Sequence, residues 1–290
     1  MNAEELLFKV NRRLRLFSFD MQLNVNRHML SGRKNAIKAY QVRFTNFGDM
    51  LTPLLLKYYG IIAVPSVPKD AELFCTGSIL EKVDKNFSGF ILGSGLLRDQ
   101  ALEFERAKIL AVRGELTRER INAPKSTALG DPGILVDRLL RFRQQKKYKI
   151  GFVPHYEDKN DQRLIEIHRK NPDQTIVIDV QMEPAWVIRK IDQCEFILSS
   201  SLHGLITADS LGIPSCWIKL SDKLIGGDFK FLDYATSTDR HMEPVCLEGT
   251  ESVNKLIIAT HEVSKNTEVL KNRLHAVFGQ FREELIRTER

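Results

Sequence analysis

The strongest constraint on the fold is a regular alternation of short apolar runs with amphipathic segments, from about residue 36 onward. The run AIKAYQV at 36–42 precedes the helical pattern TPLLLKYY at 52–59, and the run at 195–200 precedes LHGLITADSLG. Strands that alternate with helices of about ten residues form βαβ units, in which the strands are parallel. The alternation therefore predicts an α/β protein built on parallel sheets.

One segment interrupts this alternation: the basic and polar stretch RFRQQKKYK at residues 141–149. Loss of periodicity together with a gain in charge is typical of a domain boundary. We therefore expect two doubly wound, Rossmann-like domains that face a cleft, one over residues 1–145 and one over residues 146–245. The charged segment at 246–290 has a helical pattern, and we expect it to pack back on the first domain.

Composition argues against several classes of protein. No run approaches the roughly 18 consecutive apolar residues of a membrane-spanning helix, and the N-terminal segment MNAEELLFKVNRRLRLF lacks the apolar core of a secretory signal. The four cysteines are widely spaced, which indicates reduced thiols of a cytoplasmic protein. The net charge of +6 is compatible with an anionic small ligand, a nucleic acid or a membrane surface, and it selects none of them. The basic clusters at 12–15 and 138–147 are either solvated helix surface or a patch that faces an acidic glycan or the anionic lipid at the inner face of a membrane. We expect no nucleic-acid partner.

Candidate binding residues follow the apolar runs, because open α/β sheets bind ligands outside the carboxyl ends of their strands. After the first run come Asn46, Gly48 and Asp49, which predict either a capped helix or a loop that holds an anion or a hydroxyl. Gly95 belongs to a GxG turn after a later run, with Arg98 where a dinucleotide fingerprint would have its third glycine. This departure makes the turn weak evidence for a dinucleotide site.

Arg113 ends the apolar run KILAV and needs an anionic partner, because an unpaired buried guanidinium is costly. A structural ion pair with Asp131 or Glu115 would satisfy it, and so would the carboxylate or phosphate of a ligand. Asp131 itself begins an Asp-Pro-Gly sequence, which predicts a structural turn.

Two histidines and two lysines follow strands of the second half. His155 comes directly after one strand, where it is either a solvated loop residue or a donor to substrate. His203 lies in the first turn of a helix that begins after three serines, and the helix dipole there favours bound anions over imidazolium. Such a histidine is either a satisfied structural residue or a general acid or base that gains a proton when an anion binds. Lys223 and Lys230 flank a Gly-Gly pair in either a solvated hairpin or a ligand-binding loop.

The loops taken in order resemble those of the polysaccharide pyruvyl transferase family. The motifs that carry the resemblance are NFGD (46–49), GSIL (77–80), GSGL (93–96), RGELTRE (113–119), LGDPGIL (129–135), SSSLHGLITADSLGIP (199–214) and GGDFKFLDY (226–234). Each motif is weak alone, but their order over residues 40 to 240 is specific. The resemblance implies a GT-B-like fold and transfer of a pyruvyl group from phosphoenolpyruvate to hydroxyls of a sugar, giving a pyruvate ketal on a surface polysaccharide or glycoconjugate.

The resemblance also implies roles for the loop residues. The acceptor would be a sugar or a lipid-linked oligosaccharide, with no cofactor beyond the donor substrate and no metal. The expected catalytic residues are His203 as general acid and Asp49 as a base. The expected donor-binding residues, mainly in the second domain, are Arg113, Ser200, Ser201, Leu202, Lys223 and Lys230. The expected acceptor-binding residues, mainly in the first domain, are Asn46, Gly48, Gly95 and His155.

One departure from the family pattern keeps other functions open. Many members carry arginine where this chain has Ser201, so Lys223, Lys230 or Arg98 would have to supply charge to the donor site. A GT-B glycosyltransferase that uses a nucleotide sugar would share the fold, with Asp179 or Glu183 binding ribose hydroxyls. A non-catalytic scaffold protein that retains the fold is the third interpretation. The acceptor sugar and the oligomeric state do not follow from the sequence.

Overall fold

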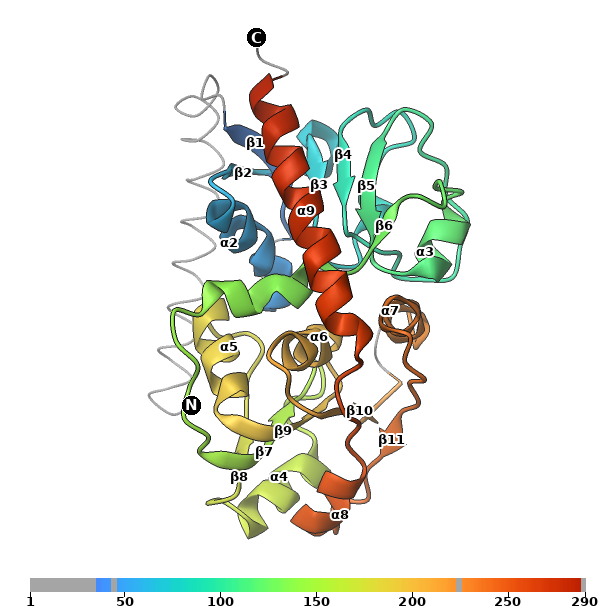
Figure 1. Ribbon diagram of the computed structural model, residues 1–290. Helices are drawn as coiled ribbons and strands as arrows, with labels where there is room; N and C mark the ends of the chain where they lie inside the picture. The colour runs from blue at the N-terminus through green and yellow to red at the C-terminus, as the bar shows by residue number, and fades with distance from the viewer. Residues whose placement is uncertain (1–34, 43–45, 223–225, 288–290) are drawn as a thin grey trace.

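In the computed structural model, which describes residues 35–42, 46–222 and 226–287, the chain forms two β-sheets, one above the other in Figure 1. The strand order is β2-β1-β3-β4-β5-β6 in the first sheet and β11-β10-β9-β7-β8 in the second. All neighbouring strands within each sheet are parallel. The expected α/β fold with parallel sheets is therefore confirmed.

The first sheet is built from short strands joined by helices and loops. Its strands are β1 (Ala36–Tyr40), β2 (Ile62–Ser66), β3 (Leu73–Phe74), β4 (Phe90–Leu92), β5 (Lys108–Val112) and β6 (Ala128–Leu129). Its α-helices are α2 (Leu51–Tyr58) and α3 (Glu115–Arg120), and its 3₁₀ helices are η1 (Gly48–Met50), η2 (Pro68–Asp70), η3 (Leu80–Lys82) and η4 (Pro132–Leu139). Strand β2 is not evident from the alternation, and it contains Pro65. Proline is tolerated there because β2 lies at the edge of the sheet.

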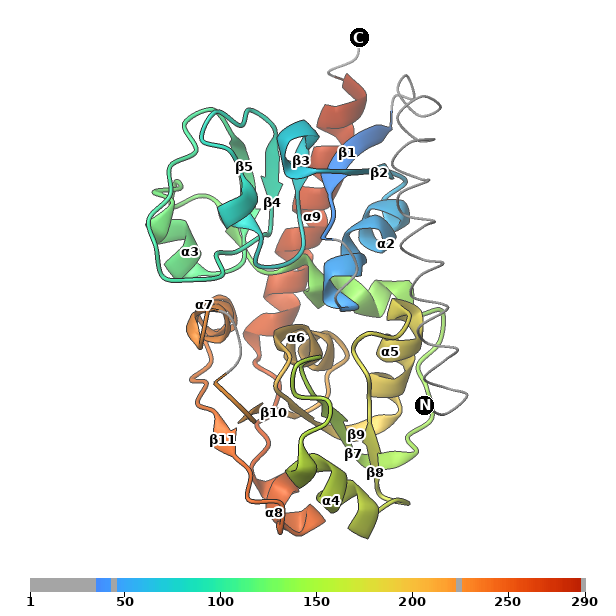
Figure 2. The same ribbon diagram turned by 180° about the vertical axis from the view of Figure 1, so that it is seen from behind.

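The second sheet shows the predicted alternation more completely. Its strands are β7 (Tyr148–Val153), β8 (Thr175–Val177), β9 (Cys194–Ser199), β10 (Ser215–Lys219) and β11 (Val245–Cys246). Its helices are α4 (Gln162–Lys170), α5 (Pro184–Asp192), α6 (Leu202–Ser210), α7 (Phe229–Thr238) and α8 (Val253–Ile258). The segment around Gly226 and Gly227, interpreted as a hairpin or a binding loop, is followed by α7. We call the parts of the protein around the first and second sheets the first and second halves. Helix α7 of the second half packs against α3 of the first half (Figure 2).

The basic segment at 141–149 leads from η4 to β7, and its charges bind to the second half. The guanidinium of Arg143 donates from Nε to Asp192 Oδ1 at 2.7 Å. The ammonium of Lys146 donates to the carbonyl oxygen of Cys194 at 2.6 Å, and burial lowers the pKa of Lys146. Two residues of the basic cluster at 138–147 therefore bind to the protein itself, although Arg143 stays partly exposed. The other expected cluster, at 12–15, lies outside the described residues.

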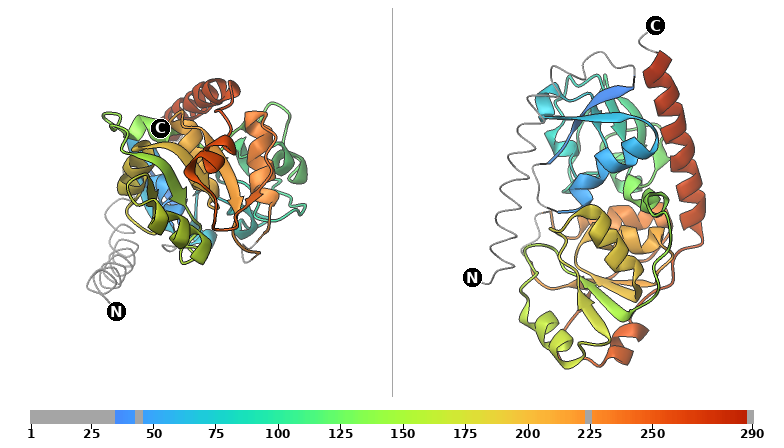
Figure 3. Two further views of the ribbon diagram at one scale, coloured as in Figure 1. Left: turned by 90° about the horizontal axis from the view of Figure 1, so that it is seen from below. Right: turned by 90° about the vertical axis from the view of Figure 1, so that its left-hand side faces the viewer.

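Helix α9 (Asn266–Arg287) is the helical C-terminal segment. It runs along one side of the first half, and its N-terminal end lies at the border with the second half (Figure 3). It contacts β5, β6, η4 and α7. Phe278 stacks on Tyr59 and Phe281 meets Phe90 edge-on, so the helix is held by aromatic contacts with the first half. None of the helices in the described residues is long and apolar enough to span a bilayer.

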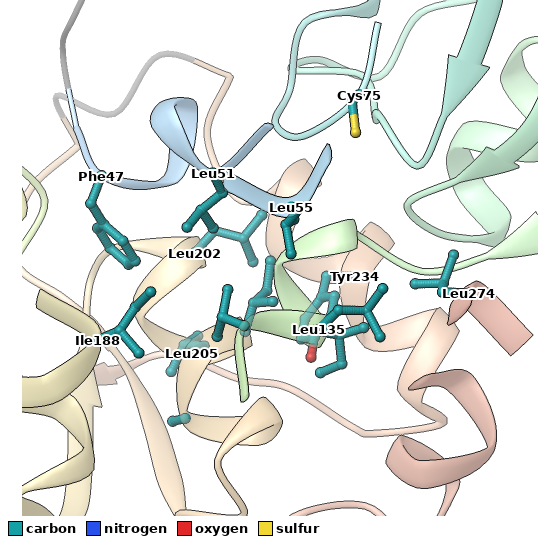
Figure 4. Packing of buried hydrophobic residues seen from close by; sticks show 14 of the residues in the cluster. Phe47, Leu51, Leu55, Cys75, Leu135, Ile188, Leu202, Leu205, Tyr234 and Leu274 are labelled. Atoms are coloured by element: carbon teal, nitrogen blue, oxygen red, sulfur yellow. The ribbon is translucent and has the colours of Figure 1, made fainter. Parts of the chain in front are cut away.

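A single hydrophobic cluster continues from one half of the protein into the other. Phe47 and Leu51 of the first half lie beside Leu202 and Leu205 of α6, with Leu135 of η4 among them (Figure 4). These side chains are almost completely removed from solvent. Because the apolar contacts extend across both halves, they hold the strand-end loops of the two sheets in a defined relation.

Candidate active site

A pocket of about 900 Å³ lies between the strand-end loops of the two sheets. Three of the expected acceptor-binding or base residues line it: Asn46, Asp49 and His155. Four of the expected donor-binding or acid residues line it as well: Ser201, Leu202, His203 and Lys230. The rule that ligands bind outside the carboxyl ends of parallel strands therefore identifies a real concavity in this fold.

His203 lies on the first turn of α6 and is 8% exposed. Its Nε2 is 3.7 Å from Oδ2 of Asp131, a residue of the first half. A Cβ atom at Gly48 would lie 2.1 Å from Nδ1 and 2.2 Å from Cγ of the ring. Gly48 thus makes room for the imidazole, whose edge also contacts Phe47. This packing, rather than direct contact with an acceptor, accounts for the glycine of the NFGD motif.

The N-terminus of α6 lines the pocket through Ser201, Leu202 and His203. Ser199 Oγ accepts a hydrogen bond from the amide of Ser201, and Ser200 Oγ accepts one from the amide of His155. Ser201 is the N-cap residue, and among the described residues no side chain caps the helix. An uncapped helix N-terminus leaves backbone N–H groups free to bind an anion. Ser200 therefore builds the loop, whereas Ser201 and Leu202 line the pocket.

Lys230 brings a partly desolvated positive charge to the pocket from α7. Burial, and then the nearby charge of Arg113, lower the pKa of Lys230 to about 8. The same lysine acts on His155, whose pKa is lowered to about 4, first by burial and then by the charge of Lys230. At neutral pH, Lys230 is therefore mostly a cation and His155 is a neutral imidazole. Lys223, the other expected lysine, lies outside the described residues.

Arg113 forms a buried ion pair instead of lining the pocket. Its Nε donates to Asp233 Oδ2 at 2.8 Å, and its two terminal nitrogens donate to Ser78 Oγ and to the carbonyl of Leu96. The side chain is fully buried. The structural alternative for Arg113 is thus the one observed, with Asp233 as the partner in place of Asp131 or Glu115.

Gly95 serves the same buried arginine. A Cβ atom at this position would lie 2.3 Å from the guanidinium carbon of Arg113. Gly95, expected to face the acceptor, therefore accommodates Arg113 and is not among the pocket-lining residues.

Asn46 and Asp49 are joined by hydrogen bonds at the start of η1. The Asn46 amide donates to Asp49 Oδ2 at 2.9 Å, and the backbone amide of Asp49 donates to Asn46 Oδ1 at 3.2 Å. The amide of Phe47 donates to the carbonyl of Val180, which connects this loop to the second half. The pair is therefore held in place at the pocket wall.

Sequence reasoning missed several pocket residues, notably Tyr40 and Tyr156. Tyr40 ends β1, so the strand-end rule itself could have identified it. Tyr156 follows His155, and the two rings lie 4.2 Å apart between centroids. Burial raises the pKa of both tyrosines, so their hydroxyls are protonated and can donate hydrogen bonds.

The acids considered for a ribose site are engaged elsewhere. Asp179 accepts from the amide of Gln181 and pairs with Lys159, while Glu183 caps α5 by accepting from the amide of Ala185. Neither residue lines the pocket. Within the part of the chain that the structure describes, no group of three His, Cys, Asp or Glu side chains is placed to hold a metal ion.

Comparisons with known proteins point in one direction. The profile of a family described as polysaccharide pyruvyl transferase matches residues 25–222. Uncharacterized protein L143 of Acanthamoeba polyphaga mimivirus is 31% identical over 215 residues, which cover 70% of this chain and 74% of that protein. Succinoglycan biosynthesis protein ExoV of Rhizobium meliloti (strain 1021) is 30% identical over 198 residues, covering 66% of this chain and 60% of that protein.

Among solved structures, the wall teichoic acid polymerase TagF matches with a TM-score of 0.48 and 11% identity, over 100% of this chain and 98% of that chain. Similarity at this level carries no inference about function.

Proposed function

Since the chain belongs to the polysaccharide pyruvyl transferase family, we propose that it transfers a pyruvyl group from phosphoenolpyruvate to two hydroxyls of a sugar. The product is a pyruvate ketal on a surface polysaccharide or glycoconjugate. The pocket carries this proposal, because it joins His203, Lys230 and the uncapped N-terminus of α6 from the second half with Asn46 and Asp49 from the first. The arrangement serves as a GT-B-like cleft, with the donor on the second half and the acceptor on the first.

The reaction sets definite demands on the site. The methylene carbon of phosphoenolpyruvate gains a proton, two bonds form between its central carbon and sugar oxygens, and the bond to the phosphate oxygen breaks. The two hydroxyls release two protons, of which one balances the proton added to carbon and the other leaves with phosphate. The enzyme therefore needs an acid, a base and cationic or N–H groups for a dianionic leaving group.

Each demand has a candidate in the pocket. His203 protonates the methylene carbon, and the N-terminus of α6 with Lys230 holds phosphate and carboxylate. Asp49 accepts a proton from an acceptor hydroxyl. Neutral His155 offers a hydrogen bond to the acceptor, because its lowered pKa keeps it uncharged at neutral pH. Arg113 acts through Asp233 by holding α7, the helix that carries Lys230.

The lowered pKa of Lys230 predicts a specific pH dependence of donor binding. Because this pKa is about 8 in the free protein, the ammonium loses its charge above that pH. The KM for phosphoenolpyruvate is then expected to rise by up to about tenfold per pH unit. In Lys230→Arg the charge persists, so KM should stay flat between roughly pH 7 and pH 10. Steady-state kinetics at fixed ionic strength measure this.

The uncharged variant is the matched control for that measurement. Lys230→Met should have a raised KM for phosphoenolpyruvate at every pH, without an inflection near pH 8. An inflection near pH 8 that persists in Lys230→Met would assign the titration to another group.

The proposed reaction is tested directly by incubating the full chain with phosphoenolpyruvate and candidate glycans. Mass spectrometry should find the pyruvyl mass increment on a glycan, with one phosphate released per increment. The free protein should also be stabilised against thermal unfolding by phosphoenolpyruvate. Stabilisation by UDP- or GDP-sugars alone, with transfer of a sugar, would instead establish a glycosyltransferase.

A further inference from the structure

Two buried atoms from opposite halves of the protein face each other without a hydrogen-bond partner. Oδ2 of Asp131 and Nε2 of His203 are 3.7 Å apart, and neither has a partner within the described residues. Asp131 is fully buried. Its other oxygen, Oδ1, accepts a hydrogen bond from the amide of Gly133 at 2.8 Å, which fixes the carboxylate with Oδ2 turned to the ring.

A proton on Nε2 would satisfy both atoms, because the ring would then donate to the carboxylate oxygen. A buried carboxylate oxygen that lacks a donor is costly, and the imidazole is the donor that the described structure offers. The separation of 3.7 Å is that of an ion pair, and a small movement of the ring makes it a hydrogen bond. Gly48, which has no side chain, packs against the Nδ1, Cγ and Cε1 atoms of the ring, while Nε2 faces Asp131, so the ring has a defined orientation.

We propose that Asp131 is a positioning residue for His203: it holds a proton on Nε2 and so leaves Nδ1 as the nitrogen that exchanges a proton with the ligand. The inference rests on the proposed role of His203 as the acid. The imidazolium carries protons on both nitrogens, and the Nδ1 proton moves to the methylene carbon of phosphoenolpyruvate. The neutral ring keeps its Nε2 proton toward Asp131, and a proton released by an acceptor hydroxyl restores Nδ1–H.

The pair also explains the LGDPGIL motif. The motif is a turn, as its Asp-Pro-Gly sequence predicts, and Asp131 caps η4 through Oδ1. A cap uses only one carboxylate oxygen, so a neutral asparagine or a serine would serve it equally well. An aspartate at this position also supplies a second carboxylate oxygen, Oδ2, which faces His203 of the other half. A carboxylate oxygen at that place can accept a hydrogen bond from Nε2–H of the ring.

The experiment compares Asp131→Asn with wild type. Asparagine keeps the size and the Oδ1 acceptor for Gly133, but it presents an NH₂ group to Nε2 and removes the charge. We expect kcat to fall by about 10- to 100-fold while the KM for phosphoenolpyruvate changes less than about twofold, because the exchange disfavours the required tautomer. Asp161→Asn is the matched control, since Asp161 caps α4 through the same contact with the amide two residues on. Its kcat should stay at the wild-type value.

A second readout does not depend on turnover. In ¹⁵N-histidine-labelled protein without substrate, neutral His203 should carry its proton on Nε2, and Asp131→Asn should move it to Nδ1. The His203 signals are assigned from their loss in His203→Gln. A proton on Nδ1 of His203 in the wild-type protein would overturn the inference, and so would a wild-type kcat in Asp131→Asn. The first result does not depend on how well the variant folds. If the tautomer is as expected but no pyruvyl transfer occurs with any acceptor, the reaction assigned to the pocket fails and the pairing stands.

Discussion

Replacing His203 with glutamine is expected to lower kcat for pyruvyl transfer by about two to four orders of magnitude. Glutamine fills a similar volume and can still donate a hydrogen bond, but it cannot deliver a proton to the methylene carbon of the donor. The side chain lies on the pocket wall at the first turn of α6, so the fold should survive. Phosphate release at saturating donor measures kcat, and thermal unfolding checks the fold.

His168→Gln is the matched control, because it makes the same substitution at a histidine outside the pocket. His168 lies on α4, outside the pocket, where its Nδ1 forms a hydrogen bond with Thr175 Oγ1 at 2.8 Å. Its replacement should affect stability slightly and leave kcat unchanged. If His203→Gln turns over within a few-fold of wild type, the proton comes from another group and the assignment of the acid is wrong.

The sequence predicts the pocket better than it predicts the partners inside it. Asn46 and Asp49 follow a strand of the first sheet, and Ser201 and His203 follow a strand of the second, so each pair lies at the carboxyl edge of its own sheet. That rule needs only the order of strands and helices, which hydrophobic periodicity provides. The placement of each loop at the edge of its own sheet therefore follows from local pattern plus topology, whereas the meeting of the two edges depends on how the halves dock.

The side-chain pairs Arg113–Asp233 and Asp131–His203 could not be predicted from the sequence by that rule. Arg113 pairs with Asp233, which lies 120 residues further along the chain on α7. The Gly-Gly pair before α7 made this segment look like a loop in the sequence. The neighbouring residues of Asp131 predict only a turn. The packing of α6 against η4 brings His203 next to Asp131. Such contacts depend on how the two halves dock, and no spacing along the chain encodes that docking.

Breaking the Arg113–Asp233 ion pair is expected to destabilise the protein by about 3–5 kcal/mol when Arg113 is replaced by methionine. Both side chains are fully buried, so the change leaves a carboxylate without its cation. Asp233 keeps hydrogen bonds from the amide and hydroxyl of Thr117, which offset part of the loss. Denaturation by urea measures the free energy of unfolding.

A surface pair provides the reference for that measurement. Lys149 and Glu195 form an ion pair at 2.7 Å, but about half of the lysine side chain is exposed. Lys149→Met should change stability far less than Arg113→Met, because solvent already screens the exposed pair. Equal losses in the two variants would show that the buried pair has no special weight.

The partner variant Asp233→Asn decides how Arg113 serves function. If Arg113 acts by holding α7, removing either partner loosens the helix that carries Lys230, and both variants should raise the KM for phosphoenolpyruvate in parallel with their loss of stability. If Arg113 instead contacts the donor, Asp233→Asn frees its guanidinium and should leave donor binding unchanged or tighter, while Arg113→Met weakens it. Because Arg113 is fully buried and its three donor nitrogens are each bonded to protein oxygens, we expect the parallel result.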